Sequence, residues 1–484
     1  MSGSSRRAAA LLLVTASALT IGVAPASAAP TFTPGSPGVG DRLLPGLGNG
    51  GYDAEQYTVD FRFEPGVPTM AGRTTMTAKA TQNLSRFNLD FAGGVVHQVR
   101  VDGRRAEFRA EGEELVITPA RPLRAGRNFA VEVEYTADRA AKVPSPVDET
   151  AGWSKLADGG FALWSQPDRA HLFFPVNDHP SDKARFTYRV DAPEGWTVVA
   201  NGIRTGERTA GGRTVVTHTT RHPITSQVAQ LAVGKFDLVT GTGPHGLPLR
   251  SAVTAGQVEQ VRPALDRISG HLAWLEARIG RPFPLETYGV LGLDGNRPTQ
   301  TDALETATLS TFLTRSLTEL QHTEPVMVHE AAHQWFGNSI SFRSYDDVWL
   351  SEGFATYFGQ LWEQEHGGTS VPDSLRRIYG ADQEARTALG SIVVSNEPSG
   401  IFGLARAGGA LVVYALRQAA GEQTFQRILQ AFLDRHRDAT ANTADFERVV
   451  ADVAGPEIAG VLREWLHSPT TPPMPGHPDW KPGS

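Results

Sequence analysis

The feature that most constrains the fold is a change in hydrophobic pattern near residue 250. Between Tyr52 and about residue 238, apolar and polar residues alternate over short runs that end at turn signals, as in TYRVDAP, WTVVANG and RTVVTHTT. Alternation with a period of two is typical of half-buried β-strands, and Asn201-Gly202 predicts a tight turn between two of them. The first half is therefore predicted to be an antiparallel β domain, a sandwich or a saddle-shaped sheet.

Helical spacing replaces this alternation after about residue 255. The segment VEQVRPALDRISGHLAWLEARIG carries apolar residues three or four apart and ends at Gly280. We predict an α+β protein in which a β domain, residues 51–245, precedes a mostly helical domain, residues 246–468. Further helices are predicted at 325–336, 350–366, 373–389, 405–420, 422–437 and 443–466.

The N-terminus has the features of a signal peptide. Arg6 and Arg7 precede an apolar run at 8–23, and Ala26-Ser27-Ala28 fits a small-residue cleavage site. Residues 1–28 are therefore predicted to be removed by cleavage after Ala28, with secretion as the consequence. An N-terminal anchor helix is the alternative, but an apolar run of roughly 16 residues is short for a membrane span.

Proline and glycine crowd the two segments that flank the predicted domains. Residues 29–50 form a leader that is expected to wrap around the protein rather than pack into it, and residues 469–484 form a Pro-rich tail that cannot continue a helix. No other stretch reaches about 18 uninterrupted apolar residues. The mature chain is therefore expected to be soluble, with no integral membrane segment.

Charge and cysteine content limit the ligands. The chain has 45 basic and 52 acidic residues, a net charge of −7, so it offers no basic field for a nucleic acid. It contains no cysteine, which excludes disulfides, thiolate zinc sites and cysteine nucleophiles. His, Asp and Glu remain as strong metal ligands.

The segment PVMVHEAAHQWFG, residues 325–337, carries the clearest chemical motif. Pro325 is placed to begin a helix and Gly337 to end it. His329 and His333 are four residues apart, so both imidazoles project from one helix face and can bind a single ion. Glu330 lies beside that ion without needing to bind it, in the H-E-x-x-H arrangement of zinc hydrolases.

A third ligand is predicted on a second helix. Glu352 follows His333 after eighteen intervening residues, at the start of a strongly apolar segment. A buried carboxylate there needs a partner, and a zinc ion is a sufficient one. His329, His333 and Glu352 would hold one Zn²⁺ per chain and leave its fourth position open for water.

This site predicts peptide-bond hydrolysis before other hydrolysis. Zinc with three protein ligands lowers the pKa of its bound water and stabilises the negative oxygen of a tetrahedral intermediate. Glu330 can accept the proton of the attacking water as general base and pass it to the leaving amine.

At these residues the sequence resembles the aminopeptidase N family of gluzincin metallopeptidases. The block VMVHEAAHQWFGNSISFRSYDDVWLSEGFATYF is similar to the family's zinc motif, FFPVNDHPSDKARFTYRV resembles its Pro-Asp-x-Pro-x-x-Lys-Ala segment, and HPITSQVAQLAVGKFD resembles a strand pair that leads out of the β domain. The likeness runs from about residue 45 to 467. It implies a saddle-like β domain, a thermolysin-like catalytic domain, and a short, secreted bacterial form without the family's C-terminal helical domain.

The resemblance also implies how the substrate is held. The family's Gly-x-Met-Glu-Asn strand matches Asp302-Ala303-Leu304-Glu305-Thr306, which keeps the Ala and the Glu. Glu305 would bind the free α-amine of a peptide, and Gln166 matches a family glutamine that lines the same amine site. Cleavage would then be restricted to the first peptide bond.

One position departs from the family in a way that bears on catalysis. Where the family places a tyrosine that stabilises the intermediate, this sequence has Arg406, and Tyr414 lies about two helical turns further along. An arginine can donate to an oxyanion, or the change can reduce activity, since losing one such donor costs about 10²–10³ in rate. Tyr414 is expected to be a packing residue.

Other polar residues receive structural interpretations. Asp346 and Asp347 are candidates to orient a zinc-binding histidine, or to cap a helix. His179, His322, His366 and His436 have no partner at ligand spacing and are predicted at the surface.

Three functions remain open from the residues. The leading hypothesis is a zinc aminopeptidase acting on peptides with a free N-terminus. The second is a zinc endopeptidase with a cleft open at both ends. The third is a zinc-containing binding protein with weak catalysis, because Arg406 replaces the expected tyrosine.

Overall fold

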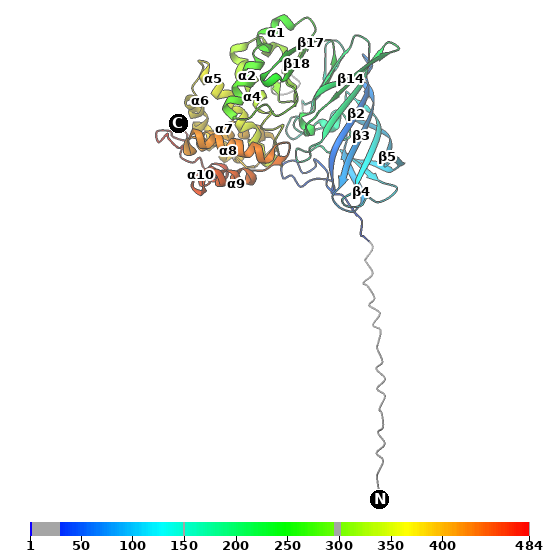
Figure 1. The fold of residues 1–484 in the computed structure, drawn as a ribbon, viewed down its shortest axis with the longest axis horizontal. Helices are drawn as coiled ribbons and strands as arrows, with labels where there is room; N and C mark the ends of the chain where they lie inside the picture. Colours follow the sequence, from blue (N-terminus) through cyan, green and yellow to red (C-terminus); the bar gives the residue numbers. More distant parts are fainter. Residues whose placement is uncertain (2–29, 149–150, 295–301, 484) are drawn as a thin grey trace. The chain divides into compact units, whose positions relative to one another are not determined.

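The alternating first half of the chain forms a sheet with one buried face. Every second residue of β2 (Tyr52–Arg62), β3 (Thr69–Ala80) and β9 (Asn128–Asp138) is largely buried, as expected where one face covers the core and the other meets solvent. The strands of this sheet pair antiparallel, except that β2 is parallel to β12 (Arg185–Pro193). The sheet has the order β14 (Ile203–Ala210), β15 (Arg213–Thr219), β12 (Arg185–Pro193), β2, β3, β9, β5 (Gly94–Val101) and β6 (Arg104–Arg105) (Figure 1).

The computed structural model describes Met1 and residues 30–148, 151–294 and 302–483. The predicted signal peptide, apart from Met1, lies outside the described residues. Met1–Thr31 and Phe32–Ser484 are separate units, and all the helices and strands named below belong to the second unit.

Two smaller sheets complete the β-rich part. One has the order β1 (Thr33–Pro34), β4 (Leu84–Asp90), β8 (Glu114–Thr118), β7 (Glu107–Glu111), and the other β10 (Gly152–Lys155), β11 (Phe161–Trp164), β16 (Leu231–Gly234), β13 (Thr197–Ala200). The turn predicted at Asn201-Gly202 connects β13 to β14, so it carries the chain from one sheet to another. Gly202 has a φ of 77°, and a Cβ there would lie 2.1 Å from the carbonyl oxygen of Thr219.

A mixed five-stranded sheet begins the second part of the chain. Its order is β17 (Phe236–Thr242), β18 (Pro248–Thr254), β19 (Val290–Leu293), β21 (Ser310–Leu313) and β20 (Ala303–Leu304). The chain enters this sheet at β17, directly after β16. The predicted boundary after residue 245 lies in the connection between β17 and β18.

Helices dominate the remainder, as predicted. They are α1 (Val258–Leu265), α2 (Ile268–Ile279), α3 (Thr314–Leu317), α4 (Leu320–Ala332), α5 (Trp349–Glu365), α6 (Val371–Leu389), α7 (Ile401–Ala420), α8 (Glu422–His436), α9 (Thr443–Ala454) and α10 (Pro456–His467). The segment predicted as one helix at 443–466 is two, because Gly455 ends α9 and Pro456 begins α10. Short strand pairs join β22 (Ser341–Phe342) to β25 (Thr440–Ala441) and β23 (Gly390–Ser391) to β24 (Val394–Ser395). The β-rich domain followed by a helical domain confirms the predicted fold class.

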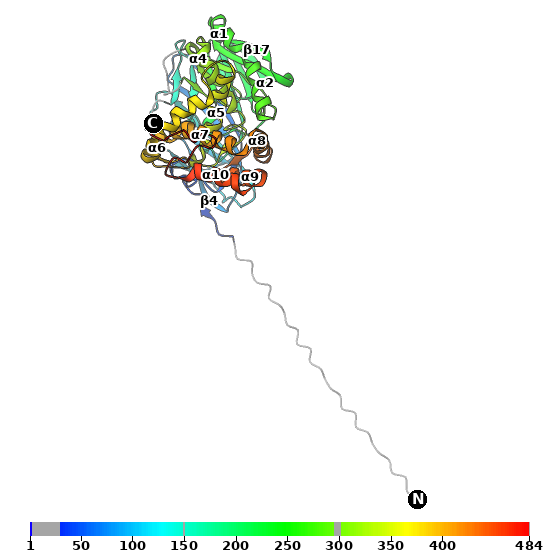
Figure 2. The ribbon, with the colours of Figure 1, turned by 90° about the vertical axis from the view of Figure 1, so that its left-hand side faces the viewer.

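Helix α5 lies between α4 and α7 (Figures 1 and 2). Glycines allow the backbone of α5 to approach the backbones of both neighbouring helices closely. A Cβ on Gly353 would lie 2.8 Å from the backbone carbon of Gly409 in α7, and one on Gly359 would lie 2.8 Å from the carbonyl oxygen of Pro325 in α4. Helix α4 starts at Leu320, so the prediction that Pro325 begins it is wrong. Pro325 lies in the second turn of α4, where it has no backbone N–H to donate to the carbonyl of Gln321.

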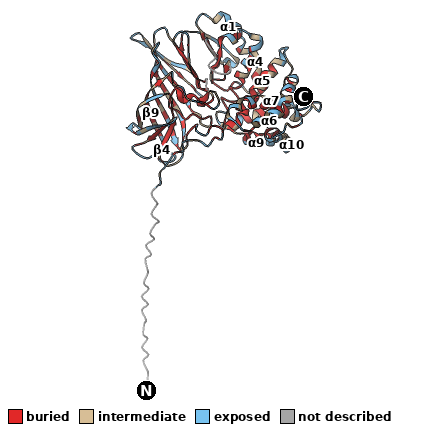
Figure 3. Cartoon of the chain, turned by 180° about the vertical axis from the view of Figure 1, so that it is seen from behind, coloured by how far each residue is buried: buried red, intermediate tan, exposed pale blue. Residues whose placement is uncertain are grey.

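Of the described helices, one at Pro398–Ala420 has the length and mean hydropathy of a membrane span. Two thirds of its apolar window are buried inside the protein, where α7 packs on α5, α6 and α10. Figure 3 shows the buried residues along these helices and along the strands of the β-rich part. The core that α7 helps to form accounts for its apolar character.

The leader packs into the protein, so the expectation that it only wraps around it is wrong. Leu43, Leu44 and Leu47 are buried in the hydrophobic core, which continues from the β-rich part into the helices. The buried Asp41 carboxylate accepts the backbone N–H groups of Leu43 and Leu44 on one oxygen and that of Tyr345 on the other. His179, predicted at the surface, is buried 3.2 Å from Asp41. The buried leucines and the hydrogen bonds of Asp41 stabilise the packing of this Pro/Gly-rich segment against the rest of the protein.

Candidate active site

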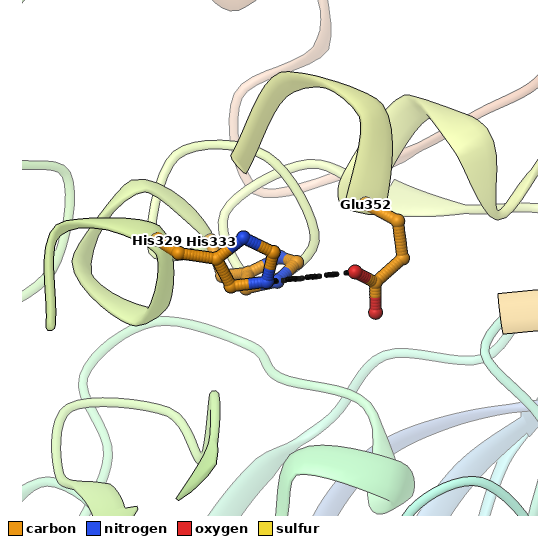
Figure 4. A group of neighbouring side chains, drawn as sticks. All are labelled: His329, His333 and Glu352. Atoms are coloured by element: carbon orange, nitrogen blue, oxygen red, sulfur yellow. Dashed lines mark hydrogen bonds and ion pairs between the residues drawn. The ribbon is translucent and has the colours of Figure 1, made fainter. Parts of the chain in front are cut away.

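The structure brings the three predicted metal donors together from two helices. His329 lies in the last turn of α4, His333 caps that helix, and Glu352 lies in the first turn of α5. The Oε2 atom of Glu352 is 3.5 Å from Nε2 of His329 and 3.9 Å from Nε2 of His333. All three side chains point toward one position (Figure 4).

Burial and charge keep these donors in the forms that bind a metal. Burial lowers the pKa of His329 to about 4, so its imidazole is neutral. Burial opposes ionisation of Glu352, but Arg406 and the two histidines hold the pKa of this carboxyl below its usual range. Two imidazoles and one carboxylate, with ligand atoms within 4.8 Å of one another, fit a zinc ion.

A serine orients one of the histidines. The Nδ1 atom of His333 is 2.8 Å from the hydroxyl of Ser351, which in turn donates to the carbonyl oxygen of Phe336 at 3.0 Å. This contact places the proton on Nδ1 and leaves Nε2 free for a metal. Ser351 directly precedes Glu352 in the chain, yet no sequence pattern singled it out.

The aspartates proposed to orient a histidine do something else. Asp346 accepts hydrogen bonds from Arg42 of the leader. Asp347 accepts the N–H and the hydroxyl of Thr443, both at 2.8 Å, at the start of α9. The interpretation that they orient a zinc ligand is therefore wrong, and Asp347 instead binds the first residue of α9, the helix that Asn442 caps.

Glu330 is a buried carboxyl with a raised pKa. It is 5% exposed, and its Oε2 atom has no hydrogen-bond partner among the described residues. Burial raises the pKa of Glu330 well above its usual value, and the neighbouring Glu305 and Glu352 raise it further. Such a group can take up and release a proton during a reaction.

The two residues predicted to bind an amine lie in contact, although they are far apart in the sequence. The amide Nε2 of Gln166 donates to a carboxylate oxygen of Glu305. Glu305 follows β20, and Asn338 donates to its backbone oxygen at 2.8 Å. One carboxylate oxygen of Glu305 lies within 4.8 Å of ligand atoms of Glu330 and His333.

Arg406 reaches the donor set, and Tyr414 does not. The Nε atom of Arg406, on α7, donates to Oε2 of Glu352 at 3.1 Å. The Tyr414 hydroxyl bonds instead to Nε2 of His477 in the tail, at 2.7 Å. Tyr414 therefore packs under the tail, as expected for a structural residue.

Several of the site residues line one cavity of about 780 Å³. Its lining includes Gln166, Glu305, His329, Glu330 and Arg406. A β-rich domain followed by a helical domain, with an H-E-x-x-H helix beside a further glutamate, defines a two-domain zinc metallopeptidase.

Comparison with known proteins identifies the family. Residues 53–227 match the peptidase M1 N-terminal domain, and residues 264–465 match the peptidase family M1 domain. The solved structure of an M1 zinc metallopeptidase from Deinococcus radiodurans is 30% identical, with a TM-score of 0.79, and the match covers 92% of this chain and 99% of that one. A mutant M1 zinc metallopeptidase from Deinococcus radiodurans, bound to a Tyr-Ser-Ala substrate, gives a TM-score of 0.80 at 30% identity over 91% of this chain and 100% of that one. The chain belongs to peptidase family M1, and its cofactor is a zinc ion.

Curated relatives are longer than this chain. Aminopeptidase M1-D of Oryza sativa subsp. japonica is 26% identical over 61% of this chain and 36% of its own length. Leucyl aminopeptidase of Saccharolobus solfataricus is 23% identical over 65% of this chain and 42% of its own length. The chain thus spans about a third to two fifths of these relatives.

Proposed function

We propose that this protein is a zinc aminopeptidase that hydrolyses the first peptide bond of peptides with a free N-terminus. The observation that carries the proposal is the carboxylate of Glu305, held by Gln166 beside the metal donors in the same cavity. The relatives named as aminopeptidases support it.

Glu305 would restrict cleavage to the chain end. A protonated α-amine bound to its carboxylate forms a charge-assisted hydrogen bond, which is stronger than a neutral one. Because this carboxylate lies within 4.8 Å of Glu330 and His333, the peptide bond nearest to a bound amine lies at the metal donors. A peptide with a blocked N-terminus loses this contact.

Glu330 would manage the proton of the reaction. The bound zinc supplies Lewis acidity, which lowers the pKa of water and polarises a carbonyl group. The Glu330 carboxylate accepts a proton from the attacking water and then donates it to the leaving amine. Its buried position and raised pKa suit this second step, because a carboxylate with a raised pKa binds the proton more strongly than an exposed one before it passes the proton on.

The test uses zinc-loaded protein and peptides supplied in free and N-acetylated forms. Loss of N-terminal residues from the free peptides alone would support the proposal. Internal cleavage of both forms would show an endopeptidase, and no cleavage with zinc bound would favour a binding protein. Glu330→Gln should abolish turnover while zinc stays bound. Glu319→Gln, the same change on an exposed residue next to α4, is the matched control.

Secretion is proposed from the N-terminal sequence. N-terminal sequencing of protein recovered from a culture medium should begin at Ala29. A sequence that begins at Met1, or protein retained with the cells, would contradict cleavage after Ala28.

A further inference from the structure

Arg406 carries the one fixed positive charge among the described residues that line the active-site cavity. The acidic residues of that lining are Asp148, Asp302, Glu305, Glu330 and Glu363. Among these charged side chains, the acidic ones disfavour an anionic part of a ligand and Arg406 attracts it. Among these lining side chains, the guanidinium group of Arg406 is the one that attracts a substrate carboxylate.

The guanidinium has donors to spare for a ligand. Its Nε atom donates to Glu352, and no other hydrogen bond joins Arg406 to a described residue. The side chain is 43% exposed. An arginine has five N–H donors in a planar fork, so the four on its terminal nitrogens remain for an acceptor in the cavity. A carboxylate matches this fork with two parallel hydrogen bonds.

Glu305 and Arg406 lie next to different metal donors. Glu305 lies within 4.8 Å of His333, whereas Arg406 contacts Glu352 at 3.1 Å. The scissile bond of a substrate must lie at the metal, so Arg406 lies next to the position of the reacting group. One residue spans at most about 3.3–3.6 Å, so the residue that follows the scissile bond is within reach of Arg406.

In a dipeptide, that following residue ends in the free C-terminal carboxylate. In a longer or amidated peptide, the same position holds a neutral carbonyl, which binds a guanidinium more weakly. We propose that Arg406 binds the C-terminal carboxylate of the substrate and makes dipeptides the preferred substrate class. The inference rests on the proposed aminopeptidase function, which places the amine at Glu305.

The test compares Leu-Ala with its C-terminal amide. For each zinc-loaded protein, the ratio of kcat/KM for the acid to that for the amide is measured. Because both substrates meet the same preparation, partial loss of zinc cancels in the ratio. The variants are Arg406→Gln, Arg406→Lys and the control Arg208→Gln, which removes an exposed charge from β14.

Wild type and Arg208→Gln should prefer the acid by about tenfold to hundredfold, the worth of a charge-assisted pair. Arg406→Gln should bring the ratio close to one through KM, and Arg406→Lys should retain part of the preference. A ratio near one in wild type would overturn the inference. An equal fall of kcat on both substrates in Arg406→Gln, with the ratio unchanged, would overturn it too, because Arg406 would then act on the reacting carbonyl or on Glu352.

Binding separates this inference from the proposed function. Calorimetric titration of zinc-loaded Glu330→Gln, alone and combined with Arg406→Gln, gives the Kd of Leu-Ala and of its amide without turnover. Tighter binding of the acid that disappears in the double variant supports the carboxylate site even if wild type hydrolyses neither compound. Equal Kd values for acid and amide refute it even if wild type is an active aminopeptidase.

Discussion

Replacing Ser351 by alanine tests whether a buried hydroxyl controls the metal site. Ser351 is 2% exposed and joins Nδ1 of His333, at 2.8 Å, to the carbonyl oxygen of Phe336. The hydroxyl accepts the Nδ1 proton and so sets the tautomer in which Nε2 carries the free lone pair. Without it, the imidazole can rotate and can place its proton on Nε2.

The expected loss of zinc affinity depends on which hydrogen-bond acceptor remains for His333 in the variant. Removing a partner of a ligand histidine typically costs about 10- to 100-fold in metal affinity. The carbonyl oxygen of Phe336 already lies 3.1 Å from Nδ1 of His333 and can still accept its proton. We therefore expect the lower end for Ser351→Ala, about a tenfold weaker zinc Kd, or ~1.4 kcal/mol.

The assay is competition for zinc against a chromophoric chelator, with metal content measured on the same samples. Ser251→Ala is the matched control, because Ser251 is a buried serine of β18, outside the cavity lining, and its hydroxyl accepts the backbone N–H of Val290 in β19. An unchanged zinc Kd in Ser351→Ala would refute the argument that this hydroxyl orients His333. A loss of zinc affinity beyond a hundredfold would refute the expected magnitude. It would mean that the carbonyl oxygen of Phe336 does not replace the Ser351 hydroxyl as the acceptor for Nδ1 of His333.

A second variant perturbs the same contact from the other side. Gly337 has a φ of 125°, and a Cβ there would lie 2.3 Å from the hydroxyl oxygen of Ser351. Gly337→Ala must displace Ser351 and strain the backbone, so zinc should bind at least as weakly as in Ser351→Ala.

Three further predictions concern stability. Zinc at 100 times its Kd should stabilise the folded protein by about 2.7 kcal/mol, so a chelator should lower the thermal midpoint, and equal midpoints would contradict the metal site. Asp41→Asn should lower the free energy of unfolding in urea by about 2 kcal/mol, because an amide cannot accept the N–H groups of both Leu44 and Tyr345, and a loss below ~0.5 kcal/mol would contradict this. Burial raises the pKa of Asp182 to about 7, so the folded protein binds a proton that the unfolded chain releases near pH 4. The free energy of unfolding should therefore fall as pH rises from about 4 to 7. In urea titrations at several pH values, it should fall less steeply with pH for Asp182→Asn than for wild type. Identical slopes against pH would exclude Asp182 as a source of the pH dependence.

Much of the metal site is readable from the amino-acid order. The i, i+4 spacing of His329 and His333 places two imidazoles on one face of a helix, whatever surrounds it. Glu352 stands out because a carboxylate in an apolar helix needs a partner. The change from a period of two to helical spacing likewise predicts the β-rich and helical parts. These features depend on contacts within a few residues, where backbone geometry dictates which side chains meet.

The remaining features depend on contacts between distant segments. Gln166 meets Glu305 across 139 positions, Arg406 meets Glu352 across 54, and the leader reaches Tyr345 through Asp41. Ser351 is adjacent to a predicted ligand, but only the packing of α5 against α4 aims its hydroxyl at His333. No local period encodes such pairs, because they arise when whole elements dock and their buried polar groups must find partners. The sequence by itself thus identifies the metal donors, whereas the packing of helices and sheets determines their orientation and their neighbours.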